Sequence, residues 1–295
     1  MGESDGGNML NGGLVSLQAI LEELKPSEQK VAQYILAHPE EVVKLSVQKL
    51  AELSGVSEAT IIRLARSLNM KGYQELKLRI AGDLNKQVTN NLGSYQEIMM
   101  EGSIESIMQA VSWNNIQSIQ DTLSVLSSDE VKRAADALSQ ARKIDVYGVG
   151  ASAVIAADIK QKFSRINLWC EAYADFHAQL TSAVNLTEQD VVIGISYSGQ
   201  TEDIIQSLTE ARQQGATIIT LTKFGPSPVA ELADIRLFTS SVEKSIRSGA
   251  MASRIAQLNV IDILFITMVS RQQEEVIPLL EKTRVAVSRT KRSSG

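Results

Sequence analysis

The chain has 295 residues, of which 44% are hydrophobic, and a net charge of −5. It is therefore too long for one small domain and too acidic to coat nucleic acid with its whole surface. The single cysteine, Cys170, excludes an internal disulfide and a cysteine-cluster metal site, and its strand-like surroundings predict a small buried side chain. Two histidines are too few for a multi-histidine metal centre, and we expect no cofactor.

The apolar stretches are too short or too polar for a signal peptide or a membrane helix. The glycine-rich start lacks an apolar core, and the longest apolar run, residues 260–269, is too short to span a bilayer. Together with the lone cysteine, these features predict a cytoplasmic protein.

The spacing of apolar residues changes along the chain from a helical period to alternating strands and helices. This change predicts an N-terminal all-α domain followed by a three-layer α/β/α domain. The expected boundaries are a disordered start over residues 1–13, a helical domain over 14–86, a linker and helix over 87–127, an α/β domain over 128–272, and a C-terminal helix and tail over 273–295.

Residues 46–68 have the pattern of two helices joined by a tight turn. Gly55 stands where the turn needs a left-handed residue, Val56 fills the corner, and Ser57 is placed to cap the second helix. The buried face of that helix is expected to consist of Ile61, Leu64, Ala65 and Leu68. This arrangement is typical of the helix-turn-helix of DNA-binding proteins.

In such a motif the second helix enters the major groove by its first turns. Residues 44–86 carry eight Lys or Arg and four Asp or Glu, a local basic excess that suits phosphate contacts, although a solvated face of a plain helical bundle would also show it. We expect Thr60 to point outward and bond a base or a phosphate. The expected DNA-binding residues are Lys49, Ser57, Glu58, Ala59, Thr60, Arg63, Arg66 and Lys71.

The second half of the chain predicts five strands alternating with helices, and hence a parallel sheet, for which we take the doubly wound order 2-1-3-4-5. A cap at Ser128 to Glu130 is expected before the first strand, and Pro226 and Pro228 are expected to break the chain after the fourth. The expected strands are residues 143–148, 167–173, 191–195, 216–222 and 234–239.

A loop rich in hydroxyl groups, from Ser196 to Thr201, follows the third strand and precedes a helix. The N-terminus of a helix favours an anion, and three hydroxyls with a glycine suit a phosphate, whereas an ordinary helix cap needs only one hydroxyl. Gly150 and Ser152 follow the first strand, which neighbours the third in this sheet order. Both loops would therefore face one anion at the point where the winding reverses.

The loop from Ser196 to Thr201, with Gly150 and Ser152 upstream, resembles the sugar isomerase (SIS) domain, and the helical part resembles the RpiR-type helix-turn-helix. In this order the two resemble the RpiR/MurR family of bacterial transcription regulators. The resemblance implies that Ser152, Ser196, Ser198 and Thr201 hold the phosphate of a phosphosugar, beside Gly199 and Gln200, the latter in a place often held by glutamate. A likeness to the MurR branch implies N-acetylmuramic acid 6-phosphate as the effector.

Three further residues are candidates for the sugar site. His177 could bond a sugar hydroxyl or be a solvated helix residue, and Arg247 and Arg254 could bind an anion or form a solvated face. Beyond Glu243 no carboxylate is close to these arginines in the sequence, so the acid–base pair that an isomerase needs is missing.

We therefore expect a regulator that binds operator DNA and senses a phosphorylated sugar, and not an enzyme. The alternatives are a phosphosugar isomerase or lyase with an accessory helical domain, and a metabolite-binding module whose helices only dimerise. We expect a homodimer or homotetramer, with the apolar helices expected over residues 103–126 and 246–269 either at the interface or buried against the sheet.

Overall fold

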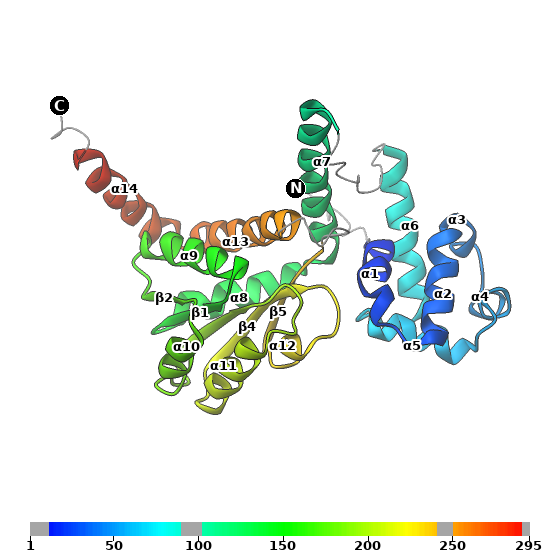
Figure 1. The fold of residues 1–295 in the computed structure, drawn as a ribbon, viewed down its shortest axis with the longest axis horizontal. Coiled ribbons are helices and arrows are strands. Elements are labelled where there is room, and N and C mark those ends of the chain that lie inside the picture. The colour runs from blue at the N-terminus through cyan, green and yellow to red at the C-terminus, as the bar shows by residue number, and fades with distance from the viewer. Residues whose placement is uncertain (1–11, 90–101, 241–249, 291–295) are drawn as a thin grey trace, which may run out of the picture. The chain divides into compact units, whose positions relative to one another are not determined.

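The computed structural model describes residues 12–89, 102–240 and 250–290 of the chain. It divides into two compact units, one formed by Met1–Val125 with Ser240–Val242 and the other by Leu126–Thr239 with Glu243–Gly295. Figure 1 draws the elements of both units.

In the described residues of the first unit all regular secondary structure is helical. Its core is formed by fully buried side chains from successive helices, among them Leu17, Ile35, Leu50, Leu64 and Leu76. The long helix α6 packs against α1, α3 and α5. The elements are α1 (Gly13–Ile20), the 3-10 helix η1 (Leu21–Glu23), α2 (Pro26–Ala37), α3 (Pro39–Val42), α4 (Val47–Ser54), α5 (Glu58–Ser67), α6 (Tyr73–Thr89) and α7 (Ile104–Val125).

Helix α1 begins inside the glycine-rich segment that the sequence predicts to be disordered. Gly12 and Gly13, expected to belong to a disordered start, are buried, and α1 begins at Gly13. The backbone N–H groups of Gly12 and Leu14 donate to the two carboxylate oxygens of Asp83 at 2.6 and 2.8 Å. Asp83 thus satisfies backbone donors that an uncapped helix start leaves unpaired. Residues 1–11 lie outside the described part of the chain.

The second unit alternates strands and helices as the sequence predicts. Some local details differ: α8 is capped by Ser127, one residue earlier than expected, β2 begins only at Cys170, and a short helix, α12, begins at the second of the two prolines. The elements are α8 (Ser128–Gln140), β1 (Ile144–Gly148), α9 (Ala151–Ser164), β2 (Cys170–Tyr173), α10 (Phe176–Ala183), β3 (Val191–Ile195), α11 (Glu202–Gln213), β4 (Thr217–Lys223), α12 (Pro228–Glu231), β5 (Ile235–Thr239), α13 (Met251–Arg271) and α14 (Gln273–Thr290).

The five strands form one parallel sheet in the order β2-β1-β3-β4-β5, which confirms the predicted topology. In this register Gly148, the last residue of β1, lies beside Ile195, the last residue of β3. The segments that follow these two strands therefore leave the sheet from adjacent positions on the same edge.

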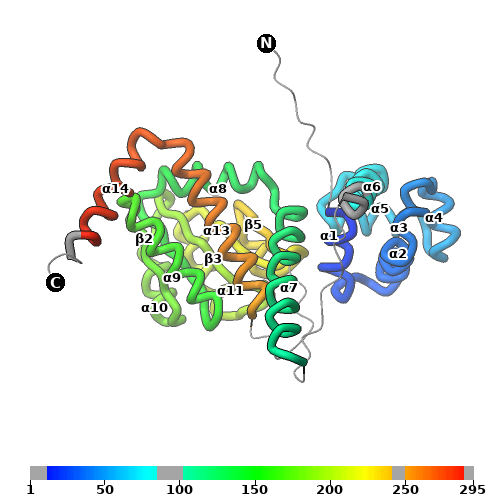
Figure 2. Tube along the Cα trace, turned by 90° about the horizontal axis from the view of Figure 1, so that it is seen from above, coloured from blue at the N-terminus to red at the C-terminus, as the bar shows by residue number. Residues whose placement is uncertain are grey.

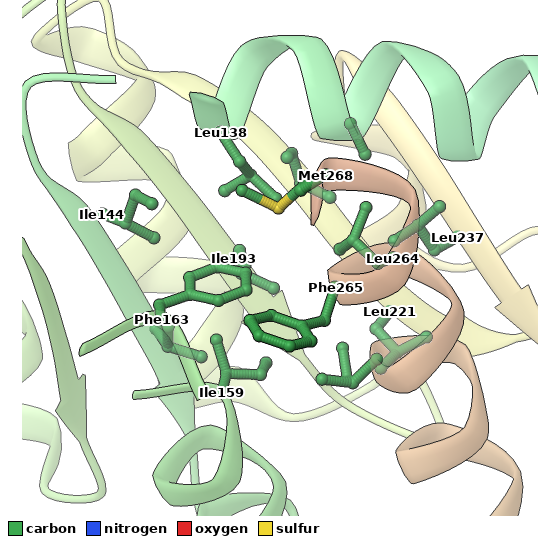
Figure 3. Close-up of a cluster of buried hydrophobic side chains, with 14 of the residues drawn as sticks. Leu138, Ile144, Ile159, Phe163, Ile193, Leu221, Leu237, Leu264, Phe265 and Met268 are labelled. Carbon is green, nitrogen blue, oxygen red and sulfur yellow. The ribbon is translucent and has the colours of Figure 1, made fainter. Parts of the chain in front are cut away.

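Helices cover both faces of the sheet, which makes the three layers expected (Figure 1). On one face α8, α9 and α13 pack over a large apolar core, with α9 and α13 side by side (Figure 2). The rings of Phe163 from α9 and Phe265 from α13 meet there (Figure 3). Their centroids are 6.5 Å apart. On the other face α10 and α11 cover a smaller core around Tyr147, Val192 and Leu208. The helices that follow β1 and β3 thus lie on opposite faces, as at a switch point.

Helix α13 is long and apolar enough, by length and composition alone, to cross a membrane, and half of its apolar stretch is buried. The buried half packs into the core of this unit through Val260, Leu264 and Met268, as core helices of globular domains do. For this helix the structure therefore shows burial against the sheet. Helix α7, in the other unit, instead exposes Ile104 and Met108.

Candidate functional site

The turn between α4 and α5 is built by local sequence signals. Ser46 caps α4 by accepting the N–H of Lys49 at 3.2 Å, and Gly55 ends the helix with φ of +65°. Val56 then donates its N–H back to the carbonyl of Ala51 at 3.0 Å. A left-handed residue with these backward bonds is the usual end of a helix before a sharp turn. The predicted helix-turn-helix is confirmed.

The first turn of α5 presents short side chains to solvent. Ser57 caps the helix by accepting the N–H of Thr60, and Ser57, Glu58 and Ala59 are exposed. Short exposed residues here would let the backbone approach a DNA groove closely. The basic residues Lys49, Arg63, Arg66 and Lys71 are also exposed.

The expectation that Thr60 points outward is wrong, because Thr60 is only 4% exposed. Its hydroxyl oxygen lies 2.9 Å from Ser57 Oγ and accepts a hydrogen bond from Arg63 Nη2 at 3.1 Å. The helical spacing places Thr60 next to Ile61 and in line with Leu64, on the buried side. Thr60 therefore supports Arg63 and does not itself reach outward.

The loop after β3 is closed by its own hydroxyl groups. Ser196 is buried, and its Oγ lies 2.8 Å from Thr201 Oγ1 while accepting the N–H of Gly199 at 3.1 Å. Ser198 is exposed and accepts the N–H of Gln200 at 3.2 Å. Thr201 is the N-cap residue of α11, so these hydroxyls lie at the end of the helix where backbone N–H groups are unpaired.

Neighbouring elements fix the shape of this loop. Ser196 and Tyr197 extend the pairing of β3, because Ser196 N donates to the carbonyl of Leu221 and Lys223 N donates to the carbonyl of Tyr197. Gly199 has φ of +66°, and its carbonyl accepts the N–H of Val229 in α12 at 3.1 Å. The loop is therefore held from β4 and from α12, and the contribution of α12 was not anticipated.

The second hydroxyl-bearing loop of the candidate site follows β1. Gly150 is exposed, has φ of +57° and forms the N-cap of α9. The N–H of Ser152 donates to the carbonyl of Val149 at 3.1 Å. A Cβ on Gly148 would lie 2.8 Å from the carbonyl oxygen of Ser152, so only glycine lets the turn fold back so tightly. The two loops leave adjacent strands, as the sequence predicted.

The three outlying candidates are not brought into these loops by any described interaction. His177 is exposed in the first turn of α10, where its carbonyl accepts the hydroxyl of Thr181. Arg254 is half-buried in the first turn of α13, and Arg247 lies outside the described residues. Their roles stay predictions.

Among the described residues of this unit, the two buried carboxylates are both paired with cations. Asp190 precedes β3 and binds Arg142 through bonds of 2.9 and 2.6 Å. Asp145 lies within β1, 2.9 Å from Lys143 Nζ, and accepts the hydroxyl of Tyr147 at 3.1 Å. Burial, with the charge of Asp145, raises the pKa of Tyr147 and keeps that hydroxyl protonated. Neither carboxylate is placed to act as a base at the hydroxyl-rich loops.

The comparisons with known proteins agree with this division. Residues 11–87 match the helix-turn-helix domain of the rpiR family, and residues 137–267 match the SIS domain. An HTH-type transcriptional regulator of Caldanaerobacter subterraneus subsp. tengcongensis is 48% identical over 94% of this chain and 99% of its own length. The HTH-type transcriptional regulator YbbH of Bacillus subtilis is 39% identical over 95% of this chain and 98% of its own.

Solved structures show the same fold. The NanR protein of Vibrio vulnificus complexed with ManNAc-6P is 25% identical, with a TM-score of 0.60 over 94% of this chain and 98% of that one. The sugar isomerase domain of an RpiR transcription factor from Sphaerobacter thermophilus shares the fold over 60% of this chain and 98% of that one, with 23% identity and a TM-score of 0.55.

The fold and the two loops define a helix-turn-helix protein that carries an SIS domain. The full-length matches show that this chain belongs to the RpiR family of transcription regulators.

Proposed function

We propose that the chain is a cytoplasmic, DNA-binding regulator of sugar-catabolism genes whose SIS domain senses a phosphorylated sugar. The observation that carries the proposal is the pair of loops, one after β1 and one after β3, that leave adjacent strands and open helices on opposite faces of the sheet. Two helix N-termini and several hydroxyl donors at one edge suit an anion with several oxygens, such as a phosphate.

The effector we favour is an amino-sugar phosphate. The Vibrio protein is complexed with ManNAc-6P, and the resemblance to the MurR branch adds N-acetylmuramic acid 6-phosphate. The proposed ligand residues around the phosphate are Gly150, Ser152, Ser196, Ser198, Gly199, Gln200 and Thr201. His177, Arg247 and Arg254 are proposed contacts for the rest of the sugar.

We assign DNA binding to residues 14–86 and ligand binding to residues 128–272, joined by the linker and helix over 87–127. The protein acts as a homodimer or homotetramer on a palindromic operator, and the exposed apolar residues of α7 suit contact with a second copy. Ligand binding changes operator affinity by favouring one arrangement of the DNA-binding units over another.

A thermal-shift screen identifies the effector, because a ligand raises stability with the logarithm of its concentration over its dissociation constant. A fluorescence titration with DNA from upstream of the protein's own operon then tests regulation. We expect salt-dependent, sequence-specific binding that changes when the stabilising sugar phosphate is added. Binding without sequence preference, or indifference to every amino-sugar phosphate, would contradict the proposal, as would turnover of a hexose or pentose phosphate.

A further inference from the structure

The exposed Arg63 is held by two other side chains. Its Nη2 donates to Thr60 Oγ1 at 3.1 Å, and its Nε lies 3.7 Å from Glu28 Oε1. Thr60 belongs to α5, whereas Glu28 comes from α2, which packs against α5. The Arg63 side chain is nevertheless 60% exposed. A long, flexible side chain is thus hydrogen-bonded at one nitrogen and within ion-pair distance of a carboxylate at another, although most of it is exposed.

Glu28 is unusually buried for a glutamate. It lies in the first turn of α2, and its side chain is only 10% exposed. Burying a carboxylate is costly unless a cation or hydrogen bonds compensate. The positive end of the α2 dipole and the guanidinium of Arg63 are both within its reach. The carboxylate therefore lies on the Nε side of the Arg63 guanidinium.

These restraints bear on how Arg63 would contact DNA. An arginine that reads guanine uses two parallel N–H groups against O6 and N7, which requires a fixed orientation of the guanidinium. An arginine that only contacts phosphate needs no fixed orientation, and a neighbouring carboxylate would weaken that contact. With Nε facing Glu28 and one Nη2 hydrogen on Thr60, both N–H groups of Nη1 and one of Nη2 remain.

We propose that Arg63 reads a guanine in the major groove and that Glu28, with Thr60, is a positioning residue that sets the angle of its guanidinium. This inference rests on the proposed function only in requiring that the chain binds DNA. Glu28 lies outside the helix-turn-helix but thereby takes part in recognition. Its carboxylate lowers the general attraction of the protein to DNA and raises the discrimination between bases.

The test uses the full-length protein and sequences selected from a random DNA library. The wild-type protein should select a G·C pair at one position of each half-site. The Glu28→Gln variant should relax the preference at that position by about tenfold, while its affinity for unrelated DNA stays equal or rises. Freed from Glu28, Arg63 can contact phosphate, so the salt dependence of binding to unrelated DNA should steepen by about one unit.

Three further variants make the result decisive. Arg63→Lys, which replaces the planar pair of N–H groups by a freely rotating ammonium, and Thr60→Val, which removes the hydroxyl, should each relax the same base position. These two variants test the same base position even if Glu28→Gln does not fold. Glu40→Gln removes an equal charge from an exposed site in α3 and should leave base preference unchanged.

Two outcomes are distinguishable. If the wild-type protein selects no sequence, the proposed function fails. If it selects one, but Glu28→Gln and Thr60→Val keep the wild-type preference or weaken all DNA equally, the positioning role is overturned while the proposed function stands.

Discussion

Gly199 lies so close to Ser227 that a Cβ built on the glycine would fall 2.2 Å from the serine Oγ. Ser227 caps α12 by accepting the N–H of Ala230 at 3.3 Å, and α12 in turn donates the N–H of Val229 to the carbonyl of Gly199. The hydroxyl-rich loop and the short helix are therefore packed as one piece, so the shape of the loop depends on a helix that contributes no residue to the proposed phosphate site.

A series of glycine substitutions separates this packing from backbone strain. Gly199→Ala should lower the free energy of unfolding by about 2–4 kcal/mol, because it adds a clash to the cost of a left-handed alanine. Gly150→Ala has open space around it but a φ of +57° with a ψ of −124°, which other residues rarely adopt, so backbone strain alone should cost about 1–3 kcal/mol. Gly72→Ala, with open space and no left-handed backbone, should cost nothing measurable. Urea unfolding measures all three, and a loss for Gly199→Ala as small as that for Gly72→Ala would contradict the packing argument.

Ser198 and Ser196 should respond differently to loss of the hydroxyl. Ser198→Ala should weaken phosphosugar binding by about 1–3 kcal/mol with little change in stability, because its hydroxyl is exposed and available to an anion. Ser196→Ala should also lower the free energy of unfolding by about 1–2 kcal/mol, because it leaves the buried hydroxyl contact of Thr201 unmade and leaves the N–H of Gly199 with only the carbonyl of Ser196. Calorimetric titration and thermal unfolding provide the measurements. An unchanged ligand affinity in Ser198→Ala would remove that residue from the site.

Cys170 should not react in the native protein. It is 3% exposed, and burial raises the pKa of its thiol to about 12, so little thiolate forms at neutral pH. A thiol reagent should modify it only after unfolding. Complete modification within minutes in native buffer would show that the strand carrying it opens readily.

The pair formed by Asp190 and Arg142 should make stability depend on acid. Burial alone would raise the pKa of Asp190, but hydrogen bonds from Arg142 and Thr187 outweigh it, so the pKa is lowered in the folded state. The stabilisation is therefore fully present above the unfolded value of about 3.9 and is lost as the pH falls through the lower folded value.

Asp190→Asn tests this at neutral pH, where it should lower the free energy of unfolding by about 1–3 kcal/mol. Because an asparagine side chain does not titrate, the difference between the variant and the wild-type protein should shrink below a pH of about 4. A constant difference across that range would show that the charge of Asp190 is not what stabilises the fold.

The sequence predicted the sheet because each strand has a continuous apolar run between turn residues, as in Val191–Ile195. Its order was taken from a common doubly wound arrangement, because the alternation of strands and helices alone does not choose between the orders that such sheets adopt. The loops were predictable from this order, since Gly150 and Ser196 follow adjacent strands. The position of Thr60 was also encoded, because it is one residue before the buried Ile61 and four before Leu64. Its polarity alone suggested an outward direction.

Other features depend on contacts between distant parts of the chain. The ordering of Gly12 depends on Asp83, and the shape of the loop at Gly199 depends on Ser227. A proline-rich stretch such as Pro226 to Pro228 indicates a turn locally, and only the packed structure shows that a helix begins there. Arg63 had been expected to contact DNA, but no local pattern links it to Glu28, 35 positions earlier.

The bonds from Gly12 and Leu14 to Asp83 also determine when, during synthesis, the first helix can be anchored. They join residues 71 and 69 positions apart, so α1 cannot acquire its anchoring carboxylate until α6 has left the ribosome. Chain elongation at about 5–20 residues per second leaves several seconds in which the first helix has no partner for its leading N–H groups. The DNA-binding unit therefore matures only when its last helix emerges, and a nascent chain stalled before residue 83 would not yet hold its first helix in place.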